Sequence, residues 1–162
     1  MSRPQLAVLV AAMTLSASVL ATEPDSISLR RMGLELALRA AQQALASCRA
    51  QGLQVGVTVV DRSGQVQVAL RDVLAPQLTL QVSQLKAYTA VSFNAPTSQL
   101  ERQGNSGLAH VPGLLFQAGA VPIAAGGTLY GAIGVSGAPL GSGDEVCAAA
   151  GAAAVATELE LQ

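Results

Sequence analysis

Hydrophobic and polar positions recur with two different periods along the chain, and the period separates helices from strands. Over residues 27–50 the apolar side chains are three and four positions apart, which places them on one face of a helix; they are Leu29, Met32, Leu36, Ala37, Ala40, Ala44 and Cys48. Residues 76–93 repeat this spacing, and residues 142–159 predict a last, alanine-rich helix. Residues 98–102 suit one short additional helical turn.

The strands come as two hairpins. Residues 53–60 are rich in β-branched side chains, 65–70 alternate polar with apolar, and the turn between them contains Gly64. A second hairpin spans 121–136 around Gly126 and Gly127. The order α-β-β-α-(α)-β-β-α predicts an α/β (α+β) fold, a profilin- or PAS-like layered sandwich with a largely antiparallel sheet flanked by helices. Residues 104–119 show no period, and such long irregular segments are usually functional or mobile.

The first 21 residues predict a secretory signal peptide. Arg3 supplies the positive start, residues 7–20 are apolar, and Val19-Leu20-Ala21 provides small residues for cleavage. We therefore expect residues 22–162 to form a single domain in the periplasm or outside the cell. No later segment offers the roughly 20 apolar residues of a membrane-spanning helix.

The composition of the chain restricts the classes of partner that it can bind. The net charge is −1 and the sequence has no basic cluster, which argues against a nucleic-acid partner. Aromatic residues make up 2% of the chain, so small aliphatic side chains must build the core. Such a sparsely charged surface leaves apolar area to cover, and assembly into a homo-oligomer is the simplest way to cover it.

Two cysteines lie in the exported part, Cys48 near the end of the first helix and Cys147 near the start of the last. Exported proteins meet oxidising conditions, so a Cys48–Cys147 disulfide is favoured over a metal site. Two buried free thiols are the alternative.

Residues 130–145 are unusually poor in side chains. Gly131, Gly134 and Gly137 let another backbone or a flat ligand approach closely, and we expect a binding surface there. Ser142 and Glu145 have the S-x-x-E spacing of a capping box at the start of the last helix.

This stretch, Gly131-Ala-Ile-Gly-Val-Ser-Gly137 followed by Asp144-Glu145, resembles the signature of the GlcG/HbpS haem-binding family. Further motifs follow the family order, and the resemblance runs from about residue 29 to 159; they are residues 59–64, Lys86-Ala-Tyr-Thr-Ala90, Pro96-Thr97 and 121–123. The resemblance implies a compact α/β domain that is often oligomeric and binds haem.

Lys86, the single lysine, stands in the K-A-x-T-A motif together with Thr89. An ammonium there suits a carboxylate, such as a haem propionate or a small organic acid, and a salt bridge to Asp61 or Asp72 is the alternative. Arg71 suits the same role. Thr89 offers a weak oxygen donor.

His110, the only histidine, lies in the irregular segment and is a candidate haem ligand or a solvated surface residue. Tyr88 and Met32 are weaker candidates, since core packing explains both. Gly134 and Ser136 are taken as part of the ligand surface. A Ser136 nucleophile is disfavoured because Ala138 replaces the last glycine of G-x-S-x-G and His110 precedes the serine.

These residues predict an exported haem- or tetrapyrrole-binding protein, an accessory or sensor protein rather than an enzyme. A haem-degrading enzyme and a small-organic-acid-binding accessory protein remain as alternatives. Haem is the expected cofactor, and no catalytic residue is assigned.

Overall fold

The computed structural model of the protein describes residue 26 and residues 28–161, so the predicted signal peptide lies outside the described residues. The predicted alternation of helices and hairpins is confirmed, and the elements are α1 (Leu34–Arg49), β1 (Gly56–Asp61), β2 (Val66–Arg71), α2 (Leu78–Phe93), the 3₁₀ segments η1 (Thr97–Asn105) and η2 (Gly107–His110), β3 (Ala120–Ala125), β4 (Thr128–Ser136) and α3 (Gly141–Glu160). None of the helices in this part of the chain is both long and apolar enough to cross a membrane.

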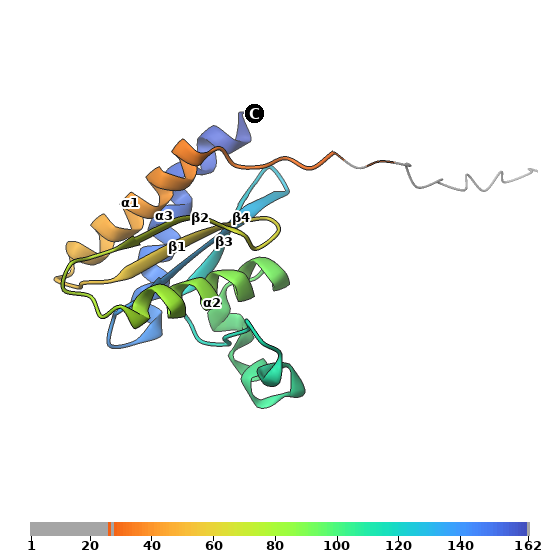
Figure 1. Cartoon of the computed structure of the whole chain (residues 1–162). Helices are drawn as coiled ribbons and strands as arrows, with labels where there is room; N and C mark the ends of the chain where they lie inside the picture. Colours follow the sequence, from red (N-terminus) through yellow and green to blue (C-terminus); the bar gives the residue numbers. More distant parts are fainter. Residues whose placement is uncertain (1–25, 27, 162) are drawn as a thin grey trace, which may run out of the picture.

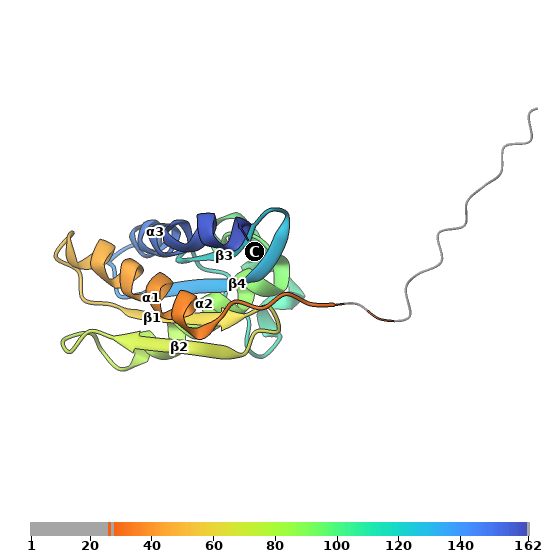
Figure 2. The same ribbon diagram turned by 90° about the horizontal axis from the view of Figure 1, so that it is seen from above.

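The four strands form one antiparallel sheet in the order β2-β1-β4-β3. Helices α1 and α3 lie side by side on one face and α2 covers the other, as Figures 1 and 2 show. The central strands β1 and β4 are covered on both faces, which explains why they consist almost entirely of apolar and small residues. This is the predicted layered α+β sandwich.

Small side chains let the α1–α3 layer pack closely. Gly151 of α3 lies against α1, where an added Cβ would come within 2.5 Å of the Ala40 carbonyl oxygen. The disulfide between Cys48 and Cys147 is present and joins the end of α1 to the first turns of α3, with the two Cα atoms 5.5 Å apart. Both cysteines are fully buried, so the bond belongs to the core of this layer.

The first helix begins later than predicted, at Leu34 instead of residue 27. Tertiary contacts hold the preceding residues extended: Arg31 pairs with Asp61 at 3.2 Å, and the Met32 carbonyl accepts a hydrogen bond from Gln67 of β2. The spacing of apolar residues cannot predict these contacts, because the residues before Leu34 continue the helical spacing although they are not helical.

The predicted capping box at Ser142 and Glu145 is wrong. Helix α3 begins at Gly141, after Leu140, without a side-chain cap. The Glu145 carboxylate instead accepts hydrogen bonds from the backbone amides of Ser98 and Gly119, at 3.0 and 3.1 Å. Glu145 thus ties η1 and the entry to β3 onto α3. Residues 97–110 form two short 3₁₀ segments where we expected one turn of helix and a loop.

The glycines of β4 admit another part of the protein and not a flat ligand. A Cβ added at Gly134 would lie 2.1 Å from the Ser83 carbonyl oxygen and 2.8 Å from the Ala87 nitrogen, both on α2. At Gly131 it would lie 2.1 Å from the Val60 carbonyl oxygen. At Gly134 and Gly131 the expectation of a ligand surface is therefore wrong, because α2 and the neighbouring strand β1 already occupy that space.

This close packing predicts a large effect for Gly134→Ala. The added methyl group forces α2 away from the sheet, and overpacking of this kind costs about 1–3 kcal/mol. Urea unfolding monitored by circular dichroism measures the loss. Gly107→Ala is the matched control, since a Cβ at Gly107 meets nothing within 4 Å, and equal stability of the two variants would contradict the prediction.

Candidate functional site

Helix α2 separates two clefts of the molecule. Lys86 and Tyr88 stand two residues apart, and a helical turn of 3.6 residues directs them to nearly opposite sides. Lys86 is buried at 3% exposure while Tyr88 is 38% exposed. Each side chain marks one cleft, and we call these the Lys86 cleft and the Tyr88 cleft.

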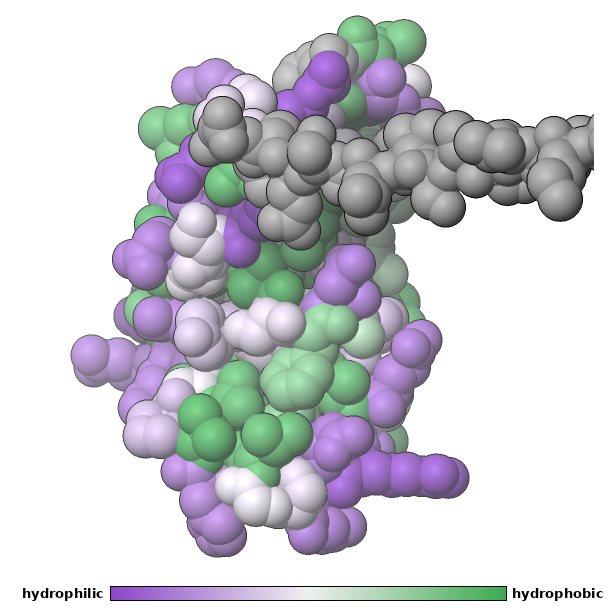
Figure 3. Space-filling model, turned by 90° about the vertical axis from the view of Figure 1, so that its right-hand side faces the viewer, coloured by the Kyte–Doolittle hydropathy of each residue, from purple (hydrophilic) through white to green (hydrophobic). Residues whose placement is uncertain are grey.

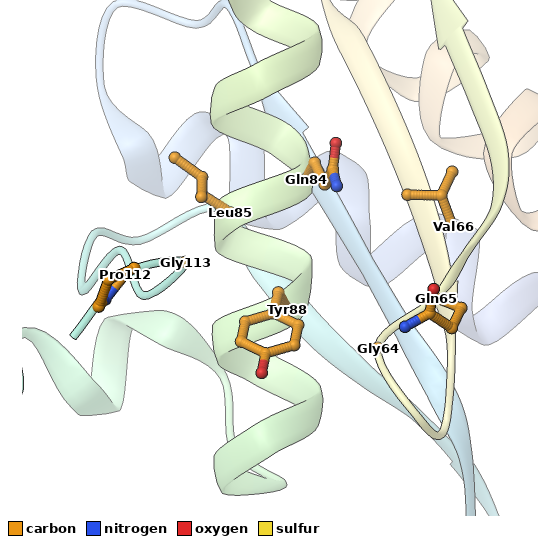
Figure 4. A pocket seen from close by; sticks show the side chains of 8 residues that line it. All are labelled: Gly64, Gln65, Val66, Gln84, Leu85, Tyr88, Pro112 and Gly113. Atoms are coloured by element: carbon orange, nitrogen blue, oxygen red, sulfur yellow. The ribbon is translucent and has the colours of Figure 1, made fainter.

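The Tyr88 cleft is an open hollow of about 460 Å³ between the β1–β2 turn, the outer face of α2 and the loop after η2 (Figure 4). The Tyr88 ring lies against two glycines: a Cβ added at Gly64 would lie 2.6 Å from the ring, and one at Gly113 would lie 3.5 Å from it. The lining residues are Gly64, Gln65, Val66, Gln84, Leu85, Tyr88, Pro112 and Gly113. The cleft thus offers one phenol and two carboxamides beside apolar atoms.

Thr89 positions one wall of this cleft. Its hydroxyl donates to the Leu85 carbonyl and accepts from the Leu115 amide, both at 2.8 Å, and the residue is fully buried. These bonds fasten the loop of residues 111–115 to α2. Thr89 is therefore placed as a support of the loop that carries Pro112 and Gly113, and its hydroxyl is already committed within the protein.

The Lys86 cleft, of about 420 Å³, lies between the first half of α2, the end of β4 and the first turn of α3. At its floor the Lys86 ammonium donates to Asp144 at 2.9 Å and to the Val135 carbonyl at 3.3 Å. Neither partner of the ion pair has more than 4% of its side chain exposed. Ser136 and Glu101 also line the cleft.

Burial raises the pKa of the Asp144 carboxyl, because the charged form loses its hydration. The Ala138 amide, which donates to this carboxylate at 2.8 Å, and the Lys86 ammonium lower the pKa by less. The Lys86–Asp144 ion pair thus lies where water hydrates it poorly, and each charge is stabilised by the other.

The alternative for Lys86, a salt bridge, is present, but Asp61 and Asp72 were the wrong partners. Asp61 is bonded to Arg31, and Asp72 to Arg49 at 2.7 Å. Asp61 also accepts hydrogen bonds from the Ser63 and Gln65 amides of its own turn, and Asp72 accepts one from the distant Val55 amide. Asp144 is the acid that faces Lys86, and only the fold brings it there from 58 positions along the chain.

Two predicted ligand residues lie apart from both clefts. Arg71, at the end of β2, donates to the backbone carbonyls of Asp72 and Ala75 and so closes the following turn. His110 ends η2 and is exposed. Neither lines the Tyr88 cleft or the Lys86 cleft, whereas Lys86 and Ser136 are brought together in one of them.

The sequence contains a signal for two residues of the Tyr88 cleft. Tyr88 occupies the variable position of K-A-x-T-A and lies one helical turn after Gln84, so both fall on the exposed side of α2. Gly64 and Gly113 each adopt a positive φ, at 79° and 93°. The contact of these two glycines with the Tyr88 ring arises only in the folded protein, and no sequence pattern predicts it.

Fold and clefts together define a layered α+β domain in which the Tyr88 cleft and the Lys86 cleft, each of small-molecule size, lie along helix α2. The family model described as haem-degrading protein HbpS-like matches residues 32–153. The chain belongs to this HbpS-like family, as the sequence motifs indicated. No curated protein matches it significantly.

Solved structures of similar fold agree with this family assignment. The chain is similar to a double mutant of Streptomyces reticuli HbpS at 40% identity and a TM-score of 0.77, covering 86% of this chain and 97% of that one. It shares its fold with the Klebsiella pneumoniae protein ORFY, at 21% identity and a TM-score of 0.75, covering 82% and 96% of the two chains. It also shares its fold with PduOC, whose structure is a haem complex, at 23% identity and a TM-score of 0.71, covering 77% and 95%.

Proposed function

We propose that this protein binds haem in the Tyr88 cleft and serves as an accessory or sensor protein. Membership of the HbpS-like family, with 40% identity to HbpS over nearly the whole domain, carries the proposal. The haem complex of PduOC supports haem binding at the level of the fold, because PduOC has the same architecture.

The residues of the Tyr88 cleft fit a haem in size and in donor chemistry. The hollow of about 460 Å³ falls within the range of about 300–1,000 Å³ of small-molecule and cofactor sites. A tyrosine phenolate is one of the protein ligands that hold haem iron. Gly64 and Gly113 let the Tyr88 ring pack between the β1–β2 turn and the loop after η2, since a Cβ at Gly64 would collide with the ring.

Apolar surface extends beyond the cleft. Figure 3 shows hydrophobic side chains gathered on the face that carries the end of α2 and the 3₁₀ segments, with hydrophilic ones around them. Three of the exposed large apolar residues of the chain belong to these elements or follow them directly, namely Phe93, Leu108 and Val111. A flat apolar macrocycle finds contact area there, while Gln65 and Gln84 supply hydrogen bonds to polar substituents.

Haemin titration tests the proposal. We expect one saturable Soret shift per chain, and for Tyr88→Phe an altered visible spectrum and at least tenfold weaker binding, because the iron ligand is removed. Tyr130→Phe is the matched control: it also removes a phenol, but one that is buried and bonded to the Leu159 carbonyl. An unchanged spectrum in Tyr88→Phe with a lost Soret shift in His110→Ala would assign the iron to His110 and contradict the Tyr88 site.

The same preparation distinguishes binding from degradation. When bound, haem supplies the iron for any oxygen chemistry, and the protein orients and shields it. The phenol and carboxamides of the cleft suit binding, so we expect the Soret band to persist with a reductant and oxygen. Its loss relative to a protein-free control would instead establish the haem-degrading activity for which the family is named.

Export and assembly belong to the proposal as well. The leader-like residues 1–21 and the Cys48–Cys147 disulfide support a periplasmic or secreted location. Val73 and Leu74 are 84% and 77% exposed, which supports burial in a homo-oligomer. Light scattering of the mature protein should give a mass several times that of one chain, and a purely monomeric solution would contradict the assembly.

A further inference from the structure

The Lys86 cleft has a floor built to hold an anion. Lys86 uses two protons on Asp144 and Val135, so its ammonium retains a third. Ser136 is 7% exposed, lines the cleft and has a hydroxyl without a hydrogen-bond partner among the described residues. Two nearly buried donors therefore face the same hollow.

The surrounding charges favour a carboxylate at this floor. Both oxygens of Asp144 are taken, one by Lys86 and the other by the Ala138 amide, so the aspartate is neutralised toward a ligand. The 20-residue helix α3 begins at Gly141 on the rim and directs the positive end of its dipole to the cleft.

The opposite wall is acidic and adds a second requirement. Glu101 of η1 lines the cleft, and one of its oxygens accepts from the Ala118 amide at 3.3 Å. The Glu101 carboxylate repels a ligand that has only a carboxylate. A ligand with a hydroxyl or ammonium group next to its carboxylate can instead donate a hydrogen bond to Glu101. Leu78 and Val82 form an apolar wall for a short alkyl group.

We propose that the Lys86 cleft is a second binding site, for a short carboxylic acid that carries a hydrogen-bond donor on the carbon next to the carboxylate. The carboxylate contacts Lys86 and Ser136, and the hydroxyl or amino group contacts Glu101. This site shares no lining residue with the Tyr88 cleft and does not depend on haem binding.

Titration calorimetry on the mature protein, with lactate and alanine as probes, tests the site. Propionate lacks the α donor and lactamide lacks the carboxylate, so each should bind at least tenfold more weakly than lactate. Ser136→Ala should weaken lactate binding about tenfold. Glu101→Gln keeps the acceptor for Ala118 and should reduce the preference for lactate over propionate.

Tyr88→Phe is the control and should leave lactate binding unchanged. The proposal is overturned if neither lactate nor alanine binds at millimolar concentration, or if Ser136→Ala binds lactate as the parent does. Haem titration of Ser136→Ala separates the two sites: normal haem binding with weakened lactate binding supports the second site even where the Tyr88 assignment fails. A lost Soret shift without any lactate binding would instead place haem in this cleft and overturn the inference.

Discussion

Lys86→Met should lower the free energy of unfolding at neutral pH by about 3–5 kcal/mol, because it leaves Asp144 charged and unpaired in the interior. The methionine fills most of the space of the lysine stem, so the effect is electrostatic and not a cavity. Urea unfolding of the parent and the variant, at several pH values, measures the loss.

The deficit should shrink on acidification. Burial already raises the pKa of Asp144, and removal of the ammonium raises it further. A carboxyl with a higher pKa in the folded state than in the unfolded state destabilises the fold as the pH rises through that interval. At acid pH the carboxyl is protonated in both states, and the difference from the parent narrows.

Two companion variants define the cause. Replacing both charges, Lys86→Met with Asp144→Leu, should recover much of the lost stability, since no lone charge remains buried. Arg62→Met removes an exposed cation and should change stability by at most about 0.5 kcal/mol. A single Lys86→Met variant as stable as the parent at neutral pH would refute the importance of the pair.

Replacing both cysteines, Cys48→Ala with Cys147→Ala, should cost about 4–5 kcal/mol. The bond closes a loop of 99 residues, and the chain-entropy model assigns this stabilisation to the restricted unfolded chain. For a domain of this size the melting temperature should fall by about 10–20 °C. Differential scanning calorimetry gives both quantities.

The parent protein provides the control for the disulfide. Both cysteines are fully buried, so a thiol reductant should act slowly on the folded protein and rapidly after unfolding. Fully reduced parent protein should then match the double variant in stability. A double variant within 1 kcal/mol of the oxidised parent would show that the bond contributes little.

The spacing of apolar and polar residues predicted the helices and strands and their order, but it misplaced some of their ends. Residues 28–33 continue the helical spacing of α1 and are nevertheless extended, because Arg31 and Met32 bond to residues of the sheet. Glu145 has capping-box spacing and yet bonds to Ser98 and Gly119. In both cases hydrogen bonds to partners distant in sequence outweigh the local preference.

The candidate sites were predictable only in part. The motif Lys86-Ala-Tyr-Thr-Ala90 marked the correct helix, but not that Lys86 faces inward, that Thr89 supports a loop or that Tyr88 lies in a cleft. Asp144 could not be assigned to Lys86, because the sequence offered Asp61 and Asp72 as partners and gave no reason to prefer Asp144. Gly134 was correctly read as a close-approach position, while the approaching group proved to be α2.

The sequence by itself determined the class of fold and the family and favoured a bond between the only two cysteines, because periodicity, motif order and residue count are properties of the chain. The tertiary structure alone decided which charges meet, which glycines face a helix and where the two clefts open. Those features depend on contacts between residues tens of positions apart, and packing of α2 against the sheet sets the Lys86–Asp144 pair, the contact at Gly134 and the walls of both clefts.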